Sequence, residues 1–153
     1  FVCTGNICRS PSAEAVFRSL VRDAGLADVI QCDSAGTQNF HVGSAPDNRA
    51  QLAALSRGYV LKDLRARQVE VSDFEEFDLV LAMDQEHYAD LRGYCRPELQ
   101  DKIKLFLSFA DAVAQIDVPD PYYGSMNGFG QMLDLIENGC RGLLAEVSTK
   151  LAS

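Results

Sequence analysis

The sequence predicts an α/β fold: a three-layer, doubly wound arrangement around a central sheet of four parallel strands. Two observations lead to this prediction. Short β-rich runs alternate along the chain with amphipathic helical patterns, which is the element order of βαβ units. The segment Phe77–Met83 contains a continuous apolar run, as is typical of a parallel strand buried on both faces.

The chain has 153 residues, of which 47% are hydrophobic, so it can bury one sizeable core without disulfides or metals. No repeat and no linker rich in Gly, Ser or Pro divides it, and we expect a single domain over residues 1–153. The chain begins with Phe1 rather than Met, and its first strand runs at once into a turn-like segment. We therefore expect this strand to be truncated at its N-terminus.

The first half of the chain contains four predicted elements. The first strand is expected to end at Val2. A helix is expected over Pro11–Ala24, with Pro11 at the first helical position, where its missing N–H costs nothing. A β-rich run at Val29–Cys32 predicts the second strand. A helical pattern over Asp47–Arg57 is closed by Gly58.

The second half contributes the remaining elements. Phe77–Met83 predicts the third strand, Glu86–Arg92 a short helix, and Lys102–Leu107 the fourth strand, with Pro97 breaking the segment between them. One long amphipathic helix closes the chain. Its apolar residues recur at helical spacing: Phe129, Met132, Leu133, Ile136, Cys140, Leu143, Leu144, Val147 and Leu151.

Composition excludes several classes of function. Lys and Arg number 14 against 22 Asp and Glu, a net charge of -8, which argues against binding to nucleic acid or anionic lipid. No apolar run approaches the roughly 18 residues of a membrane span, so no membrane insertion is expected. No segment has the pattern of a signal peptide, and we expect a cytoplasmic protein. Five cysteines, an odd number, favour reduced thiols over a disulfide framework.

The segment Cys3–Pro11 is the strongest candidate for a functional site, because ligands of doubly wound folds bind beyond the carboxyl ends of the strands. Backbone N–H groups of a short loop and the positive end of the following helix together stabilise a phosphate-sized dianion. Gly5 lets the chain turn, and Arg9 can offer two parallel N–H bonds to phosphate oxygens. The same positive environment favours the thiolate of Cys3, which is its nucleophilic form.

The alternative is that Cys3 is a small buried hydrophobic residue beside a turn, which is the usual role of a single cysteine. The spacing argues against this alternative. A cysteine followed after five residues by Arg-Ser arises by chance on the order of once in a hundred chains. The setting between a strand and a helix makes a chance match rarer, so we favour a functional thiol.

The segment Val2–Glu14, V-C-T-G-N-I-C-R-S-P-S-A-E, resembles the N-terminal signature of the low-molecular-weight protein tyrosine phosphatases. The resemblance covers nearly the whole chain. Further matching segments are Ser34–Gly36, Val42–Gly43, Pro46–Asp47, Ala66–Gln68, Met83–Asp84 and Asp117–Gly124. This resemblance implies a phosphate-binding loop between the first strand and the first helix. It also implies phosphotyrosine-containing proteins or small aryl phosphates as substrates, inorganic phosphate as product and competitive ligand, and no cofactor.

The pair Asp120-Pro121 is the candidate source of the proton that the reaction needs. Breaking an aryl phosphate ester requires a proton for the departing oxygen, which a carboxylic acid on a facing loop can supply. Pro121 stiffens that loop, and Tyr122 and Tyr123 could form aromatic walls around a phenyl ring. Standing alone, Asp-Pro-Tyr-Tyr-Gly would be interpreted as an ordinary turn. Its pairing with the Cys3 loop favours the catalytic interpretation.

The resemblance implies a double displacement that requires no metal. Cys3 attacks phosphorus, Arg9 clamps the phosphate, and Asp120 protonates the tyrosyl oxygen. Asp120 then activates the water that hydrolyses the cysteinyl-phosphate. The other residues implied in the phosphate-binding loop are Thr4, Gly5, Asn6, Ile7, Cys8 and Ser10.

Four further positions match supporting residues of the family. Asn6 and Ser10 would brace the loop and hydrogen-bond the Cys3 thiolate, and Asp84 would be a buried acidic support. Each could instead satisfy local backbone groups, the usual role of Asn, Ser and Asp. Phe40 aligns with an aromatic position on the pocket rim, although a single Phe is more often a core residue.

The resemblance also gives Cys8 a role as the resolving thiol that forms a reversible disulfide with an oxidised Cys3. Cys32, in the predicted second strand, and Cys140, on the apolar face of the last helix, are interpreted as core residues. Cys95 has no assigned role. A zinc site is disfavoured because the chain has no second metal-spaced cysteine pair and only two histidines.

The sequence departs from the family at Leu64, where many relatives carry a His that helps hold the loop asparagine. This leaves open how Asn6 is braced.

Three alternative functions remain. Thioredoxin-coupled arsenate reductases need two further redox cysteines, and Cys95 has no second cysteine near it. Protein-arginine phosphatases carry Thr where this chain has Ile7, so Ile7 favours phosphotyrosine. A non-enzymatic anion-binding or redox-sensing module would bind phosphate without turnover, and the presence of Asp120 argues against it because binding alone needs no acid.

Overall fold

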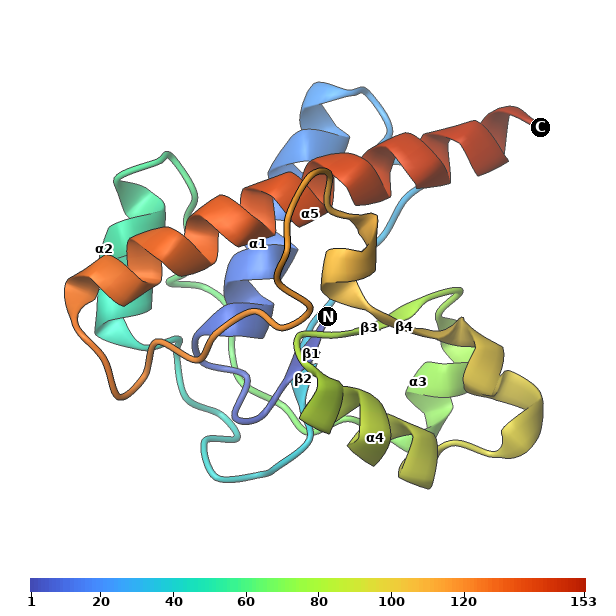
Figure 1. The fold of residues 1–153 in the computed structure, drawn as a ribbon, viewed down its shortest axis with the longest axis horizontal. Helices are drawn as coiled ribbons and strands as arrows, with labels where there is room; N and C mark the ends of the chain where they lie inside the picture. The colour runs from blue at the N-terminus through green and yellow to red at the C-terminus, as the bar shows by residue number, and fades with distance from the viewer.

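The computed structural model describes residues 1–153 and has a sheet of four parallel strands in the order β2-β1-β3-β4 (Figure 1). The register pairs Val2 with Ala35, Val2 with Ala82, and Val80 with Ile103. The predicted four-stranded parallel sheet is therefore confirmed. In chain order the elements are β1 Val2–Cys3, α1 Arg9–Asp23, β2 Ala35–Gly36, α2 Asn48–Leu55, α3 Val71–Glu76, β3 Val80–Ala82, α4 Gln85–Tyr94, the 3-10 helix η1 Pro97–Lys102, β4 Ile103–Leu105, the 3-10 helix η2 Phe106–Phe109 and α5 Met126–Ala152.

Helices cover both faces of the sheet, which confirms the three-layer, doubly wound arrangement. Figure 1 shows α1, α2 and the long α5 on one side and α3 and α4 on the other. The larger core cluster joins α1 to the buried stripe of α5, whose members include Phe129 and Ile136. A smaller cluster contains Phe74 of α3 and Leu91 of α4. None of the helices combines the length and apolar character that crossing a bilayer requires.

The predicted second strand was placed wrongly. Residues 29–32 form no strand, because the N–H groups of Val29 and Ile30 both bond back to the Leu26 carbonyl and close a turn. The Val29 side chain is 62% exposed. The strand is instead β2, whose two small residues were expected to follow it.

Element boundaries differ in smaller ways. Helix α1 begins at Arg9, so Pro11 is its third residue rather than its first, and it remains tolerated because the first four helical N–H groups need no intrahelical acceptor. Helix α2 ends at Leu55, two residues earlier than expected, and α4 is longer than expected. The long last helix is confirmed. Helix α3 was not predicted, since six residues show too little periodicity.

Candidate active site

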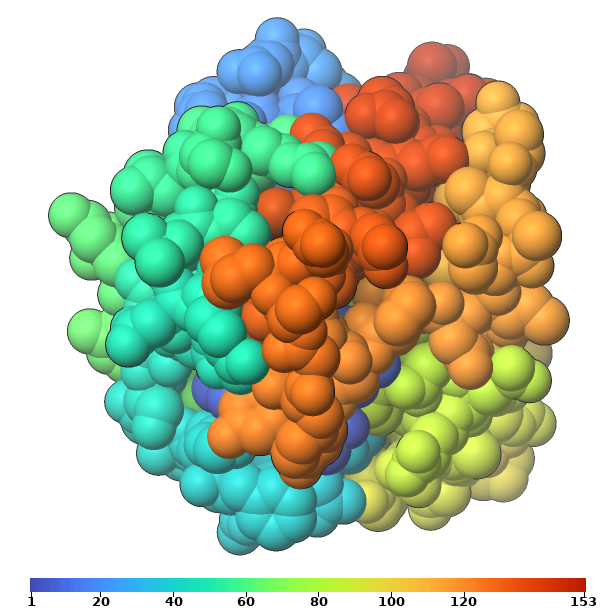
Figure 2. Space-filling model, turned by 60° about the vertical axis from the view of Figure 1, so that its left-hand side comes forward, coloured from blue at the N-terminus to red at the C-terminus, as the bar shows by residue number.

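A cavity of about 130 Å³ opens beyond the carboxyl end of β1. Figure 2 shows the N-terminal segment in dark blue at the bottom of an opening between the segment around residue 40 and the segment around residue 120. The cavity brings together ten of the residues that the sequence singled out, with His41 as the one addition. Its lining is Cys3, Thr4, Gly5, Ile7, Cys8, Arg9, Phe40, His41, Asp120, Tyr122 and Tyr123.

The loop between β1 and α1 turns its carbonyl groups outward. The Cys3, Thr4 and Ile7 carbonyls accept backbone hydrogen bonds of 2.8, 3.0 and 2.9 Å from segments outside the loop. The N–H groups of residues 5–8 donate to no acceptor within the protein. Because the carbonyl groups point outward, these N–H groups point toward the inside of the loop, next to the first turn of α1. The loop is therefore an anion-binding nest at a helix N-terminus.

The turn of the loop is made by Asn6 and not by Gly5 as the sequence suggested. Asn6 has a φ of 58°, in the left-handed region that Asn tolerates better than most residues, whereas Gly5 does not have a positive φ. Gly5 is needed for a different reason. A Cβ at Gly5 would lie 2.8 Å from Cδ2 of His41, so glycine lets that ring pack against the loop.

The Cys3 thiol is buried at the base of the cavity and contacts a hydroxyl. Ser10 Oγ lies 3.0 Å from Cys3 Sγ, and either atom can be the donor. Asn6 Nδ2 donates to the same Ser10 oxygen at 2.7 Å. The single hydroxyl hydrogen of Ser10 can be donated either to a Cys3 thiolate or to the Ala35 carbonyl, which lies 3.4 Å from Oγ. The structure thus places Asn6 and Ser10 directly behind the thiol.

Asn6 is braced without the histidine that Leu64 replaces. Its Nδ2 donates to Ser34 Oγ at 2.9 Å, and its Oδ1 accepts from the Arg67 backbone N–H at 3.0 Å. Ser34 in turn donates to the buried Glu14 carboxylate at 2.6 Å. Sequence reasoning assigned no role to Ser34 or Glu14, although both lie in segments that match the family.

Arg9 is buried and is held by one of its two terminal nitrogens. Nη1 donates to Asp84 Oδ2 at 2.8 Å and to the Val118 carbonyl at 2.9 Å. The edge formed by Nε and Nη2 is left to offer two parallel hydrogen bonds. Burial alone would raise the pKa of Asp84, but hydrogen bonds from the His87 backbone and Arg9 outweigh it and hold that pKa below its ordinary value. Asp84 thus stays ionised behind the arginine.

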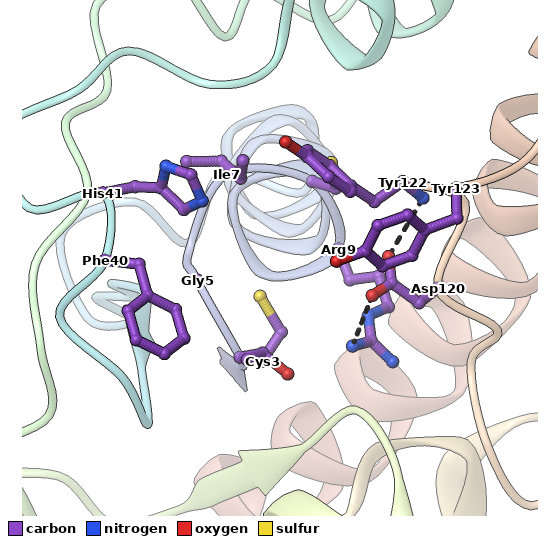
Figure 3. Close-up of a pocket in the computed structure, with 11 residues that line it drawn as sticks. Cys3, Gly5, Ile7, Arg9, Phe40, His41, Asp120, Tyr122 and Tyr123 are labelled. Carbon is purple, nitrogen blue, oxygen red and sulfur yellow. Dashed lines mark hydrogen bonds and ion pairs between the residues drawn. The ribbon is translucent and has the colours of Figure 1, made fainter.

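Asp120 lies on the wall next to Arg9. Its Oδ2 is 3.6 Å from Arg9 Nη2, and its Oδ1 accepts from the Tyr122 backbone N–H at 3.0 Å (Figure 3). The Tyr122 and Tyr123 rings pack edge to face with centroids 4.9 Å apart. The carboxylate is therefore held by its own loop while remaining partly open to the cavity.

The cavity mouth is aromatic on both sides. In Figure 3, Phe40 and His41 face Tyr122 and Tyr123 across the space above Cys3. Phe40 is 71% exposed, so it is a rim residue and not a core residue. His41, whose ring centroid is 6.5 Å from that of Tyr122, was missed by sequence reasoning, and its only signal was its position next to Phe40.

The other cysteines differ in position. Cys8 is buried beside the cavity, and burial raises the pKa of its thiol. Cys140 is in the core, as predicted. Cys32 is only half-buried and lies outside any strand, so its predicted strand position is wrong. Cys95 is buried in the cluster of the α4 side. All five thiols are free.

Gly36 provides a test of how tightly β2 supports the loop. A Cβ at this position would lie 2.6 Å from the Thr4 carbonyl oxygen and 3.2 Å from the Asn6 nitrogen, both backbone atoms that cannot rotate away. We expect Gly36→Ala to lower the free energy of unfolding by about 2 kcal/mol and to distort the loop. Urea unfolding and the Kd for inorganic phosphate measure the two effects. Gly93→Ala, with open space around it, is the control and should do neither.

His87 of α4 predicts a pH-dependent stability. Burial, followed by the charge of Arg9, lowers the pKa of His87 from its ordinary value of 6.5 to about 4 in the folded protein. Below pH 6.5 the unfolded chain binds a proton that the folded chain excludes, so the contribution is complete above pH 6.5 and is lost towards pH 4. A shift of this size corresponds to about 3 kcal/mol in total. The measurement is urea unfolding of the wild type and of His87→Gln at about pH 7 and at about pH 5. The free energy of unfolding should fall less on acidification in His87→Gln than in the wild type. Equal losses would contradict this prediction.

Comparison with known proteins agrees with this geometry. Residues 1–153 match the family described as "Low molecular weight phosphotyrosine protein phosphatase". A low molecular weight protein-tyrosine-phosphatase of Streptomyces coelicolor is 48% identical over 150 residues, which is 96% of this chain and 91% of that protein.

Solved structures give the same result. A protein tyrosine phosphatase from Entamoeba histolytica, with Hepes in its active site, superimposes with a TM-score of 0.95 at 39% identity and covers 98% of this chain and 96% of its own. Vibrio vulnificus Wzb in complex with benzylphosphonate has a TM-score of 0.82 at 28% identity, covering 95% and 94% of the two chains. The chain therefore belongs to the low molecular weight protein tyrosine phosphatase family and is a phosphatase.

Proposed function

We propose that this phosphatase hydrolyses phosphotyrosine and aryl phosphate monoesters through a cysteinyl-phosphate intermediate. Cys3 is the nucleophile, Arg9 the phosphate clamp and Asp120 the general acid and base. The observation that carries the proposal is the single cavity that these three residues line together with the unpaired N–H groups of the loop. The chemistry of each step follows from that arrangement.

In the first step the Cys3 thiolate attacks phosphorus while the phosphate rests on the loop. The loop N–H groups and the Nε–Nη2 edge of Arg9 hold the nonbridging oxygens as charge develops on them. The bond from phosphorus to the phenolic oxygen breaks, and protonated Asp120 donates its proton to that oxygen. The products of the step are the free phenol and a phosphoryl group on Cys3.

In the second step a water molecule attacks the phosphoryl group of the cysteinyl-phosphate. Asp120, now a carboxylate, takes a proton from this water, and the Cys3 thiolate leaves with the electron pair of the S–P bond. Ser10 stabilises the departing thiolate through the 3.0 Å contact between Oγ and Sγ. Inorganic phosphate is released, and because it fits the same loop it also competes with substrate.

The rim supports a preference for aryl substrates. Phe40 and the two tyrosines at the cavity mouth offer apolar faces on opposite sides of the space in which a phenol ring would stand. A phosphoserine side chain has no ring to place between these aromatic faces. Phosphotyrosine-containing proteins and small aryl phosphates are therefore the proposed substrates.

Cys8 is proposed as the resolving thiol. Cys3 and Cys8 both line the cavity, and a disulfide between them would hold an oxidised Cys3 at a reversible stage. The unpaired thiols also favour a reducing compartment, and we propose the cytoplasm.

The proposed function is tested by steady-state hydrolysis of para-nitrophenyl phosphate and of phosphotyrosine, phosphoserine and phosphoarginine peptides, all with a metal chelator. We expect turnover of the two aryl phosphates only. Main activity on phosphoarginine would transfer the assignment to the arginine phosphatases. Activity that the chelator abolishes would refute the metal-free mechanism.

Asp120→Ala should reveal the proton transfer through its dependence on the leaving group. General acid catalysis contributes about 10²- to 10⁴-fold, and only poor leaving groups need the proton. We therefore expect kcat for phenyl phosphate to fall by about 10³-fold and kcat for an acidic nitrophenol ester to fall much less. Equal losses across a series of substituted phenyl phosphates would indicate a structural role for Asp120. Asp117→Ala, three residues earlier in the same loop, is the control for loop disturbance.

A further inference from the structure

His87 of α4 links two parts of the active site that are far apart in sequence. Its side chain is almost completely buried, and Nε2 lies 2.8 Å from Thr4 Oγ1, the residue that follows Cys3. Its Nδ1 lies 3.0 Å from Asp84 Oδ1. The other oxygen of Asp84 accepts from Arg9 Nη1 at 2.8 Å. The imidazole therefore stands between the loop and the carboxylate that holds the phosphate clamp.

The neighbouring carboxylate favours one tautomer of this ring. An ionised carboxylate only accepts hydrogen bonds, so a lone pair on Nδ1 would face negative charge at 3.0 Å. We assign the ring hydrogen to Nδ1 on this ground, although Nδ1 has no hydrogen-bond partner within the protein. Nε2 is left as an acceptor. The Thr4 hydroxyl consequently donates to His87 and does not turn its hydrogen into the cavity.

Both carboxylate oxygens of Asp84 have contacts in this arrangement. Its Oδ1 also accepts the His87 backbone N–H at 2.9 Å, which starts helix α4. The same carboxylate thus caps the helix, faces the imidazole and anchors Arg9. Replacing the imidazole would leave the part-buried Thr4 hydroxyl without its acceptor, which costs free energy, and would empty the space that the ring fills beside Asp84 Oδ1.

We infer that His87 is a positioning residue, which fixes Thr4 on one side and the Asp84–Arg9 pair on the other so that loop and clamp keep one relative orientation. This inference rests on the proposed function. Because His87 acts through Arg9 and the loop, removing it should weaken binding of phosphate as well as turnover. Arg9 would still carry its charge, so the loss should be far smaller than that caused by removing the nucleophile.

The test is a double-mutant cycle on kcat/KM for para-nitrophenyl phosphate, together with the Kd for inorganic phosphate. Thr4→Val should lower kcat/KM about tenfold, the factor of one lost hydrogen bond, and His87→Leu should lower it at least as much, because this change also removes the ring beside Asp84. The double variant should lose no more than His87→Leu alone, because that substitution already breaks the contact with Thr4. Losses that multiply would overturn the inference.

A conservative variant separates positioning from general destabilisation. The terminal amide of Gln reaches the place of Nε2 and can accept from Thr4, so His87→Gln should keep kcat/KM within about threefold of wild type. Leu91→Val, a buried change in the same helix, should lower the melting temperature and leave kcat/KM and the phosphate Kd unchanged. If Leu91→Val reduces activity as much as His87→Leu, or if His87→Gln gives no rescue, the positioning role is refuted.

The cycle is run beside Cys3→Ser so that two failures can be told apart. If wild-type turnover depends on Cys3 and the losses multiply, only the role of His87 fails. If turnover survives Cys3→Ser, the proposed mechanism and this inference fail together.

Discussion

Replacing Cys3 with serine should abolish hydrolysis while leaving phosphate binding intact. The serine hydroxyl is a far weaker nucleophile than a thiolate at neutral pH, and removal of a catalytic nucleophile costs about 10⁴-fold or more in kcat. The groups that hold the anion are the loop N–H groups and Arg9, and none of them changes. We therefore expect kcat for para-nitrophenyl phosphate to fall to background and the Kd for inorganic phosphate to stay within about threefold, since no phosphate-binding hydrogen bond is lost.

The control for this experiment is Cys32→Ser, a half-buried thiol outside the cavity, which should keep wild-type turnover. Mass spectrometry of wild-type enzyme quenched during turnover should find one phosphoryl group on the peptide that contains Cys3. Residual turnover near the wild-type rate in Cys3→Ser would exclude Cys3 as nucleophile. Loss of phosphate binding along with turnover would mean that the serine had disrupted the loop, and a Cys3→Ala variant would then be compared.

The loop of the candidate active site could be predicted from the sequence because its parts are consecutive. Nine residues contain the thiol, the arginine and the beginning of the helix. Local geometry alone therefore determines how these three parts lie relative to one another. The choice of Asp120 as the candidate acid depended on the Cys3 loop and the family resemblance, since Asp-Pro-Tyr-Tyr-Gly resembles an ordinary turn by itself. Asp120 lies beside Arg9 because of the path of the long connection between β4 and α5. No local sequence pattern predicts this path.

The second strand shows where local reasoning fails. Residues 29–32 have the β-branched composition of a strand, but the hydrogen bonds to Leu26 turn them away from the sheet. Ala35 and Gly36 have no such composition, and they form the strand because they pair with Val2 and Cys3. Close contact between this strand and the loop requires small residues there. A two-residue strand is thus defined by its tertiary partners and not by its propensity.

The residues behind the loop were missed for a related reason. Ser34, Glu14 and His87 come from three different segments, and each acts through hydrogen bonds that exist only in the folded chain. Each is also almost completely buried, although these residue types are usually exposed. In the proposed mechanism, buried polar side chains of this kind support the loop without touching substrate.

The acidity of the chain is compatible with its anionic substrate because of how the charges are distributed. The net charge is -8, but charges farther away than roughly 8 Å are screened at physiological salt. Within the cavity the nearest groups are the guanidinium of Arg9 and the N–H groups of the loop. The negative potential of the remaining surface then acts on the substrate's flanking residues, and basic flanks should be favoured.

Arg9→Lys should impair binding and turnover together, although it conserves the charge. The guanidinium satisfies two demands at once, since Nη1 holds Asp84 and the Val118 carbonyl while the Nε–Nη2 edge faces the cavity. A lysine has one nitrogen and cannot make the anchoring bonds and two parallel bonds to phosphate simultaneously. The loss of charge-assisted hydrogen bonds worth about 1.5–3 kcal/mol each predicts a fall in kcat/KM of at least about 10²-fold.

The phosphate Kd should rise in the same variant, which distinguishes it from Cys3→Ser, in which only turnover is lost. Arg22→Lys, at an exposed position in the same helix, is the matched control and should change neither quantity. Asp84→Asn provides a second check, because it removes the anchor and keeps the guanidinium. If positioning by Asp84 matters, this variant should lie between the wild type and Arg9→Lys. A mild effect of Arg9→Lys on both quantities would show that a point charge suffices, and the bidentate clamp would have to be abandoned.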